Sequence, residues 1–238
     1  MKPPRVPLYY FPDVLIHADE STVRNHEHYA AAKAGNFAAA EALISAFDQG
    51  LIDWLRVMLD GHASELVPVH ALESLGVNEI PAALARRINH WLHLPVNDSI
   101  VQANSVGHTK ASGFYRLAHQ AQFFGPVTPG QSYFLVDDFV GQGGTLANLI
   151  GYIKSQGGEV LGATVLTGKP HSAKLAPDDA SIQALREKHG LELENWWREH
   201  FGFGFDCLTR SEARYLENSA DADTIRDRLA AAGLESGA

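Results

Sequence analysis

Two adjacent carboxylates, followed at once by a glycine-rich loop, are the residues of this 238-residue chain best suited to chemistry. Asp137 and Asp138 come directly after an apolar run, and the loop Gly141–Thr145 begins three residues later. Glycine lets the backbone take left-handed conformations, so several N–H groups can converge on one anion, and the positive end of a following helix adds to the attraction. The pattern therefore predicts an anion site beside two carboxylates.

The elements around this stretch predict how it is positioned. The apolar run Tyr133–Val136 predicts a buried strand that stops at the acids, and apolar residues at helical spacing predict a helix over 145–155. Leu66–His70 and Glu159–Thr167 predict two more buried strands. Strands that alternate with helices predict an α/β fold with a doubly wound, mainly parallel sheet, whose ligand site lies beyond the carboxyl ends of the strands. The acid pair falls there, and we expect both carboxylates to be exposed to the cleft.

We expect three segments along the chain. Residues 1–62 predict an N-terminal helical segment that takes no part in the sheet, and residues 63–175 predict the α/β core. Residues 176–238 predict a C-terminal helical module, in which Thr209 and Glu212 have the spacing of a capping box. Either flanking segment could form a hood over the site.

Composition narrows the class of protein. The formal net charge of −9 argues against a general nucleic-acid surface, which needs clustered Lys and Arg. Cys207 is the single cysteine, which excludes an intrachain disulfide and a CxxC metal site. Because no apolar run approaches the roughly 18 residues of a membrane helix, we expect a cytoplasmic protein without a membrane contact.

The loop differs from the commonest nucleotide-binding loops. It carries no lysine, unlike the GxxxxGK[ST] loop, and it is not a GxGxxG loop followed by a ribose-binding acid. Acids next to a phosphate loop suit a ligand with hydroxyls beside a phosphate, such as ribose 5-phosphate. The acids could also orient water on Mg²⁺. Histidines in the N-terminal third are possible zinc ligands, but they do not form an HExxH pattern.

The stretch Phe134–Val140 with Gly141–Thr145 resembles the phosphoribosyl pyrophosphate (PRPP) signature of type I phosphoribosyltransferases. Gly141-Gln142 stands where threonines are more usual in that family. Upstream, residues 66–94 resemble the family's first strand, pyrophosphate-binding loop and following helix, with a pattern most similar to the competence-associated, ComF-like branch. The resemblance covers about residues 64–170.

The resemblance implies that Mg²⁺-bound PRPP loses pyrophosphate from C1 and a nitrogen nucleophile takes its place with inversion. By position, Asp137 and Asp138 would hold the ribose diol and contact Mg²⁺ through water. The loop residues implied to hold the 5-phosphate are Gly141, Gln142, Gly143, Gly144 and Thr145. The other implied site residues are Ala71, Leu72, Glu73 and Ser74 at pyrophosphate, Lys110 and Arg116 on a closing loop, and Lys169 near the base.

Two functional classes stay open at this point. The first is a phosphoribosyltransferase of nucleotide metabolism, with PRPP and an unknown acceptor as substrates and a homodimer as the expected assembly. The second is a PRPP- or nucleotide-binding regulatory or competence-type protein with little transferase activity. The small number of basic residues between 104 and 130 keeps the second class open, since Lys110 and Arg116 could equally be solvated loop charges.

Overall fold

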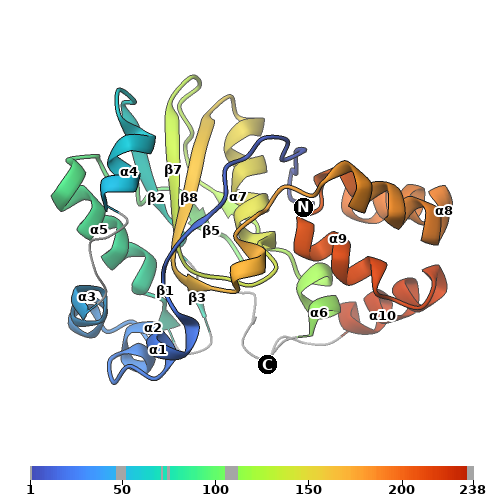
Figure 1. Ribbon diagram of the computed structural model, residues 1–238, viewed down its shortest axis with the longest axis horizontal. Coiled ribbons are helices and arrows are strands. Elements are labelled where there is room, and N and C mark those ends of the chain that lie inside the picture. Colours follow the sequence, from blue (N-terminus) through green and yellow to red (C-terminus); the bar gives the residue numbers. More distant parts are fainter. Residues whose placement is uncertain (1, 47–51, 71, 74–75, 105–111, 235–238) are drawn as a thin grey trace.

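The protein is built on a parallel four-stranded sheet with helices on both faces (Figure 1). The computed structural model describes residues 2–46, 52–70, 72–73, 76–104 and 112–234. The strands lie in the order β1 (Leu15–Ala18), β8 (Glu159–Gly168), β7 (Ser132–Val140) and β2 (Ser64–Pro68), and each neighbouring pair is parallel. This arrangement confirms the predicted α/β fold class.

The central strand β7 is buried on both faces because its apolar side chains alternate between two cores. Tyr133 and Leu135 belong to a core shared with helix α7 (Gly144–Ser155). Phe134 and Val136 belong to the core on the other face, formed with helices α3 (Phe37–Ala46), α4 (Ile52–Leu59) and α5 (Ile80–Leu92). A continuous apolar run, rather than an alternating one, is therefore what this position requires.

Local signals in the sequence set several helix ends. The Asn36 side chain accepts a hydrogen bond of 2.9 Å from the Ala39 N–H and so caps the start of α3. Helix α5 has Pro81 in its first turn, where the missing N–H costs no hydrogen bond. Helix α7 stops before Gly157, whose φ of +85° is left-handed and favours glycine after a helix end.

The N-terminal segment contributes a strand, so the prediction that residues 1–62 take no part in the sheet is wrong. Strand β1 pairs with β8 from Leu15↔Thr164 to Ala18↔Thr167. It is followed by two short helices, α1 (Glu20–Arg24) and α2 (Tyr29–Lys33). A four-residue edge strand flanked by helical patterns carries too little periodicity to be recognised before its partner is known.

Strand β7 also runs further than predicted. It continues past the acids to Val140, which pairs with Gly168 of β8. The remaining short elements are β3 (Leu72–Glu73), β4 (Gly76–Val77), β5 (Val101–Gln102), β6 (Phe123–Phe124) and the 3-10 turn η2 (Pro170–Ser172). In the described ranges, no helix combines the length and the apolar character needed to cross a membrane.

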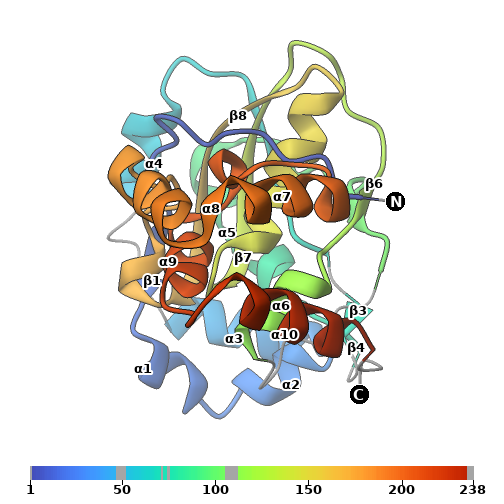
Figure 2. The ribbon, with the colours of Figure 1, turned by 90° about the vertical axis from the view of Figure 1, so that its right-hand side faces the viewer.

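A third core lies in the C-terminal module, which faces the viewer in Figure 2. It comprises α8 (Asp179–Phe201), the 3-10 turn η3 (Phe205–Cys207), α9 (Arg210–Glu217) and α10 (Ala222–Leu234). Helix α6 (Gly113–Ala118) belongs to this core through Phe114 and Leu117, although it comes from the middle of the chain. The predicted capping box of Thr209 and Glu212 at the start of α9 is confirmed.

Candidate functional site

The acid pair lies near the carboxyl end of β7 and is buried, contrary to the predicted exposure. Asp137 is 6% exposed and Asp138 is 8% exposed. Lys33 Nζ, from α2, donates a hydrogen bond of 2.9 Å to Asp138 Oδ2. The Asp138 N–H donates to Asp137 Oδ1 at 2.8 Å. One lysine and one backbone N–H therefore compensate two buried carboxyl groups.

Burial shifts the protonation equilibrium of Asp137. It raises the pKa of Asp137 well above its ordinary value of 3.8, and the neighbouring charge of Asp138 raises it further. The Asp138 N–H and Lys33 act in the opposite direction and are the smaller effects. When Asp137 is protonated, it offers a ligand hydroxyl a hydrogen-bond donor, and the lysine-paired Asp138 offers an acceptor.

The glycine loop at the start of α7 would let a ligand approach its backbone closely. Gly143 is the N-cap residue of this helix, with φ +80°, and no side chain caps the helix there. A Cβ on Gly143 would stand 2.4 Å from Leu175 Cδ2, so both the backbone conformation and the space require glycine. The first N–H groups of α7 have no partner inside the helix and are suited to bind an anion.

The C-terminal module binds the carbonyl side of this loop. Thr209 Oγ1 donates to the Gln142 carbonyl at 2.5 Å, and Arg5 Nη2 lies 3.4 Å from the Gly144 carbonyl oxygen. In a trans peptide the N–H points opposite to the carbonyl. The Gly143 N–H therefore points away from Thr209 of the module.

A buried ion pair stands behind the loop. Arg5 Nη1 lies 2.5 Å from Glu212 Oε2, with side chains 1% and 3% exposed. Arg5 Nε donates to Asn148 Oδ1 of α7 at 2.5 Å. Glu212 Oε2 also accepts from the Thr209 N–H at 2.9 Å, which completes the capping box. The N-terminal segment, α7 and α9 thus meet at one network.

The structure places the other predicted site residues as follows. Arg116 lies on helix α6, so its predicted place on a loop is wrong, yet its Nη1 is 2.8 Å from where a Cβ of Gly141 would be. Lys169 follows β8 directly, and its Nζ lies 2.7 Å from Glu20 Oε2. Leu72 and Glu73 form β3. Ala71, Ser74 and Lys110 lie outside the described residues.

Sequence reasoning missed the N-terminal contribution to the site. Lys33 reaches Asp138 across 105 positions of the chain. The Arg24 guanidinium of α1 lies 5.0 Å from the centre of the Phe139 ring, one residue after the acids. No local spacing connects these residues to the acids, because β1 brings α1 and α2 to the carboxyl edge of the sheet.

The donor set fits Mg²⁺ only through water. In the described part of the chain, no group of three or more His, Cys, Asp or Glu side chains could hold a metal. Asp138 is already paired with Lys33, and burial favours a protonated Asp137. Mg²⁺ keeps several waters and takes one or two carboxylates together with substrate phosphate oxygens. Asp138 could serve as such an outer partner.

The chain matches two curated relatives. It is 38% identical over 232 residues to Protein TraN of Escherichia coli, and the match covers 97% of this chain and 52% of TraN. It is 37% identical over 144 residues to an uncharacterized protein of Haemophilus influenzae, covering 60% of this chain and 32% of that protein. The chain thus spans about half the length of the E. coli relative. No family model matches it.

Solved structures that resemble the protein include phosphoribosyltransferases. One adenine phosphoribosyltransferase is 14% identical, with 51% of this chain and 69% of that chain covered and a TM-score of 0.35. The adenine phosphoribosyltransferase of Rhodothermus marinus is 15% identical, with 71% and 82% covered and a TM-score of 0.38. A purine phosphoribosyltransferase of Pyrococcus horikoshii is 18% identical, with 52% and 76% covered and a TM-score of 0.35. All three TM-scores are below 0.5, and the four-stranded parallel sheet itself shows the α/β fold.

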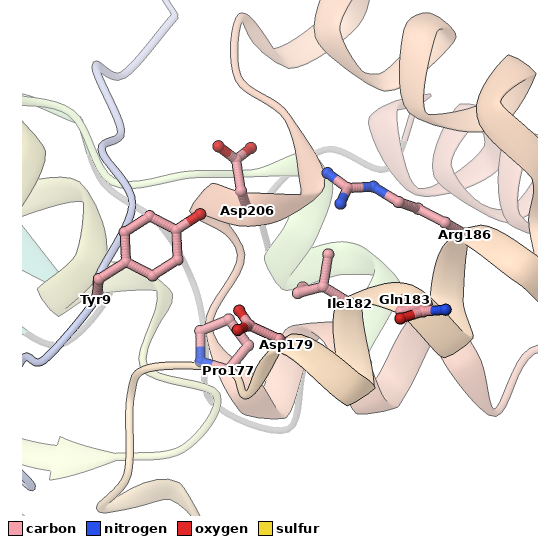
Figure 3. A pocket seen from close by; sticks show the side chains of 7 residues that line it. All are labelled: Tyr9, Pro177, Asp179, Ile182, Gln183, Arg186 and Asp206. Carbon is pink, nitrogen blue, oxygen red and sulfur yellow. The ribbon is translucent and has the colours of Figure 1, made fainter.

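A separate pocket of about 390 Å³ lies between the N-terminal segment, α8 and η3 (Figure 3). It is lined by Tyr9, Pro177, Asp179, Ile182, Gln183, Arg186 and Asp206. Arg186 is paired with Glu194 through two hydrogen bonds of 2.7 and 2.9 Å. None of the predicted site residues lines this pocket, so it is distinct from the carboxyl edge of the sheet.

Proposed function

We propose that this protein is a phosphoribosyltransferase that binds Mg²⁺-PRPP at the acid pair and glycine loop and transfers phosphoribose to or from a nitrogen nucleophile. One observation carries the proposal. The buried pair of Asp137 and Asp138 and the uncapped N-terminus of α7 lie at the two ends of the same short stretch, at the carboxyl end of a central parallel strand. A ribose 5-phosphate carries its diol at one end and its phosphate at the other, so the diol would face the acids and the phosphate would face the N-terminus of α7.

The residues at this site suit the binding of PRPP as the phosphoribosyl donor. The two carboxyl groups would bind the vicinal hydroxyls, and the N–H groups of Gly143–Thr145 would bind the 5-phosphate. Arg116 Nη1 lies beside Gly141, at the edge of the loop. Mg²⁺, when bound with PRPP, would neutralise charge on the pyrophosphate oxygens.

Transfer then depends mainly on electrostatics. The C1–O bond to pyrophosphate breaks, its electron pair leaves with pyrophosphate, and a C1–N bond forms on the opposite face. Positive charge develops on the ribose ring in the transition state, and the carboxylate of Asp138 would stabilise it. The motif of the donor site comes from the sequence resemblance, and the geometry of β7 and α7 supports it.

A thermal-shift titration with PRPP and Mg²⁺, followed by a pyrophosphate-release assay over a panel of bases and amines, tests the proposal. We expect the melting temperature to rise with PRPP, because a ligand that binds only the folded state stabilises it. Pyrophosphate should be released with at least one acceptor. No shift at millimolar PRPP would contradict the proposed donor site.

A PRPP- or nucleotide-binding protein without turnover is the second candidate. The contact between Lys33 and Asp138 favours it, because this lysine already neutralises the acid that would face the ribose ring. A clear PRPP shift together with no pyrophosphate release from any acceptor would select this candidate over the transferase.

A further inference from the structure

Arginine side chains from two distant segments meet next to the acid pair. The Arg24 guanidinium lies over the Phe139 ring, 5.0 Å from its centre. A Cβ on Gly141 would lie 2.8 Å from Arg116 Nη1 and 3.2 Å from Phe139 Cε1, so Arg116 and Phe139 border the same point. Arg24 comes from α1 and Arg116 from α6, and both flank the strand end that carries the proposed site.

Positive charge is concentrated here on an acidic protein. Glu20 Oε1 lies 2.9 Å from Arg24 Nε, and its other oxygen pairs with Lys169 at 2.7 Å, so one carboxylate serves two cations. The pKa of Arg116 is lowered, first by burial and then by the charge of Arg24. Two guanidinium groups close enough to disfavour each other's charge are suited to share an anion.

We propose that Arg24 and Arg116 form the acceptor subsite of the proposed transferase and bind the carboxylate of an acidic, planar acceptor. This inference rests on the proposed function. Guanidinium groups present forks of donors that match a carboxylate, and they stack on flat rings. The half-buried Phe139 side chain offers an apolar surface next to Arg24 and Gly141.

Matched acid and neutral acceptors test the subsite. We would compare nicotinate with nicotinamide and orotate with uracil, by pyrophosphate release and by thermal shift in the presence of PRPP and Mg²⁺. The variants are Arg24→Gln, Arg116→Gln and their combination, with Arg24→Lys and Arg116→Lys to retain charge. Arg56→Gln is the matched control, because Arg56 lies on α4 with its side chain 59% exposed.

We expect the wild-type protein to prefer an acid over its neutral partner. Each Gln variant should raise the KM for the acid roughly tenfold or more, as for loss of a charge-assisted hydrogen bond. The Lys variants should retain part of the affinity, and the PRPP shift should survive in all variants. Arg56→Gln should change nothing.

Three outcomes would overturn the inference while leaving PRPP binding established. These are a preference for neutral bases, binding of none of the acids, or an acid preference that persists in the double Gln variant. Loss of the PRPP shift in that variant would also overturn it, because the arginines would then serve the donor's phosphate. Absence of a PRPP shift in the wild-type protein would instead refute the proposed function itself.

Discussion

Asp137 shows how a single residue's environment sets its chemistry. Its carboxyl is buried, lies next to a second carboxyl, and receives one backbone hydrogen bond. Burial and the charge of Asp138 outweigh the hydrogen bond and Lys33, so its pKa is raised. The raised pKa favours the protonated form, which can donate a hydrogen bond that an ionised aspartate cannot.

This raised pKa makes stability depend on pH. Between pH 3.8 and the raised pKa of Asp137, the folded state holds a proton that the unfolded state has lost. The free energy of unfolding therefore falls as pH rises through that window, by up to about 1.4 kcal/mol per pH unit. In the Asp137→Asn variant, the free energy of unfolding should fall less over the same pH range. Urea unfolding of both proteins from pH 4 to 8 measures the difference, and parallel curves would contradict it.

The double variant Asp137→Asn with Asp138→Asn should lose the PRPP-induced thermal shift or lower it at least tenfold in apparent affinity, while the protein still unfolds cooperatively. Asparagine keeps the size of each side chain but removes the negative charge that Lys33 and the ligand would meet. Asp53→Asn is the control, since the Asp53 side chain is 90% exposed on α4. An unchanged PRPP shift would show that the ligand binds elsewhere.

At the scale of elements, the glycine loop depends on what packs against it. Leu175 and Thr209 lie where side chains from loop positions would otherwise go, and the Thr209 hydroxyl binds the Gln142 carbonyl. The geometry of the loop is thus determined jointly by its glycines and by the C-terminal module.

Alanine substitutions at two glycines with similar φ values can distinguish the cost of backbone strain from the cost of lack of space. Gly143→Ala and Gly130→Ala both place alanine at a left-handed φ, +80° and +77° respectively. Nothing lies within 4 Å of a Cβ at Gly130, whereas Leu175 lies 2.4 Å away at Gly143. Gly130→Ala should cost about 1–2 kcal/mol of unfolding free energy, and Gly143→Ala about 1–3 kcal/mol more. Equal losses in chemical denaturation would show that Leu175 moves aside freely.

The described part of the chain has three cores, and polar contacts join them near the proposed site. The blue N-terminal segment in Figure 1 crosses from the C-terminal module to the sheet and carries Arg5 to Glu212. Helix α6 belongs to the module's core, yet its Arg116 reaches the glycine loop. The proposed site is therefore assembled from segments at both ends of the chain.

Breaking the buried ion pair should be costly. Glu212→Gln keeps the size of the side chain but leaves the Arg5 charge buried without a counter-charge, which should cost about 3–5 kcal/mol. Adding Arg5→Met should recover part of that loss, because the unpaired charge disappears with it. The exposed pair of Arg226 and Asp223 provides the comparison, and Asp223→Asn should cost at most about 1 kcal/mol. A double-mutant cycle with additive losses would contradict this coupling.

The sequence by itself determined the parallel α/β class, the strand–loop–helix order around the acids, and caps such as Asn36 and Thr209 with Glu212. Each of these depends on neighbours within a few positions, which the sequence states directly. It also pointed to Asp137, Asp138 and the glycine loop as one site.

Only the tertiary structure decided what surrounds that stretch. The pairing of β1 with β8, the contact of Lys33 with Asp138, and the place of α6 in the C-terminal core all join residues far apart in the chain. The burial of the acids likewise depends on the elements packed over them. Such contacts leave no periodic or local signal, because they are set by how the three cores pack together.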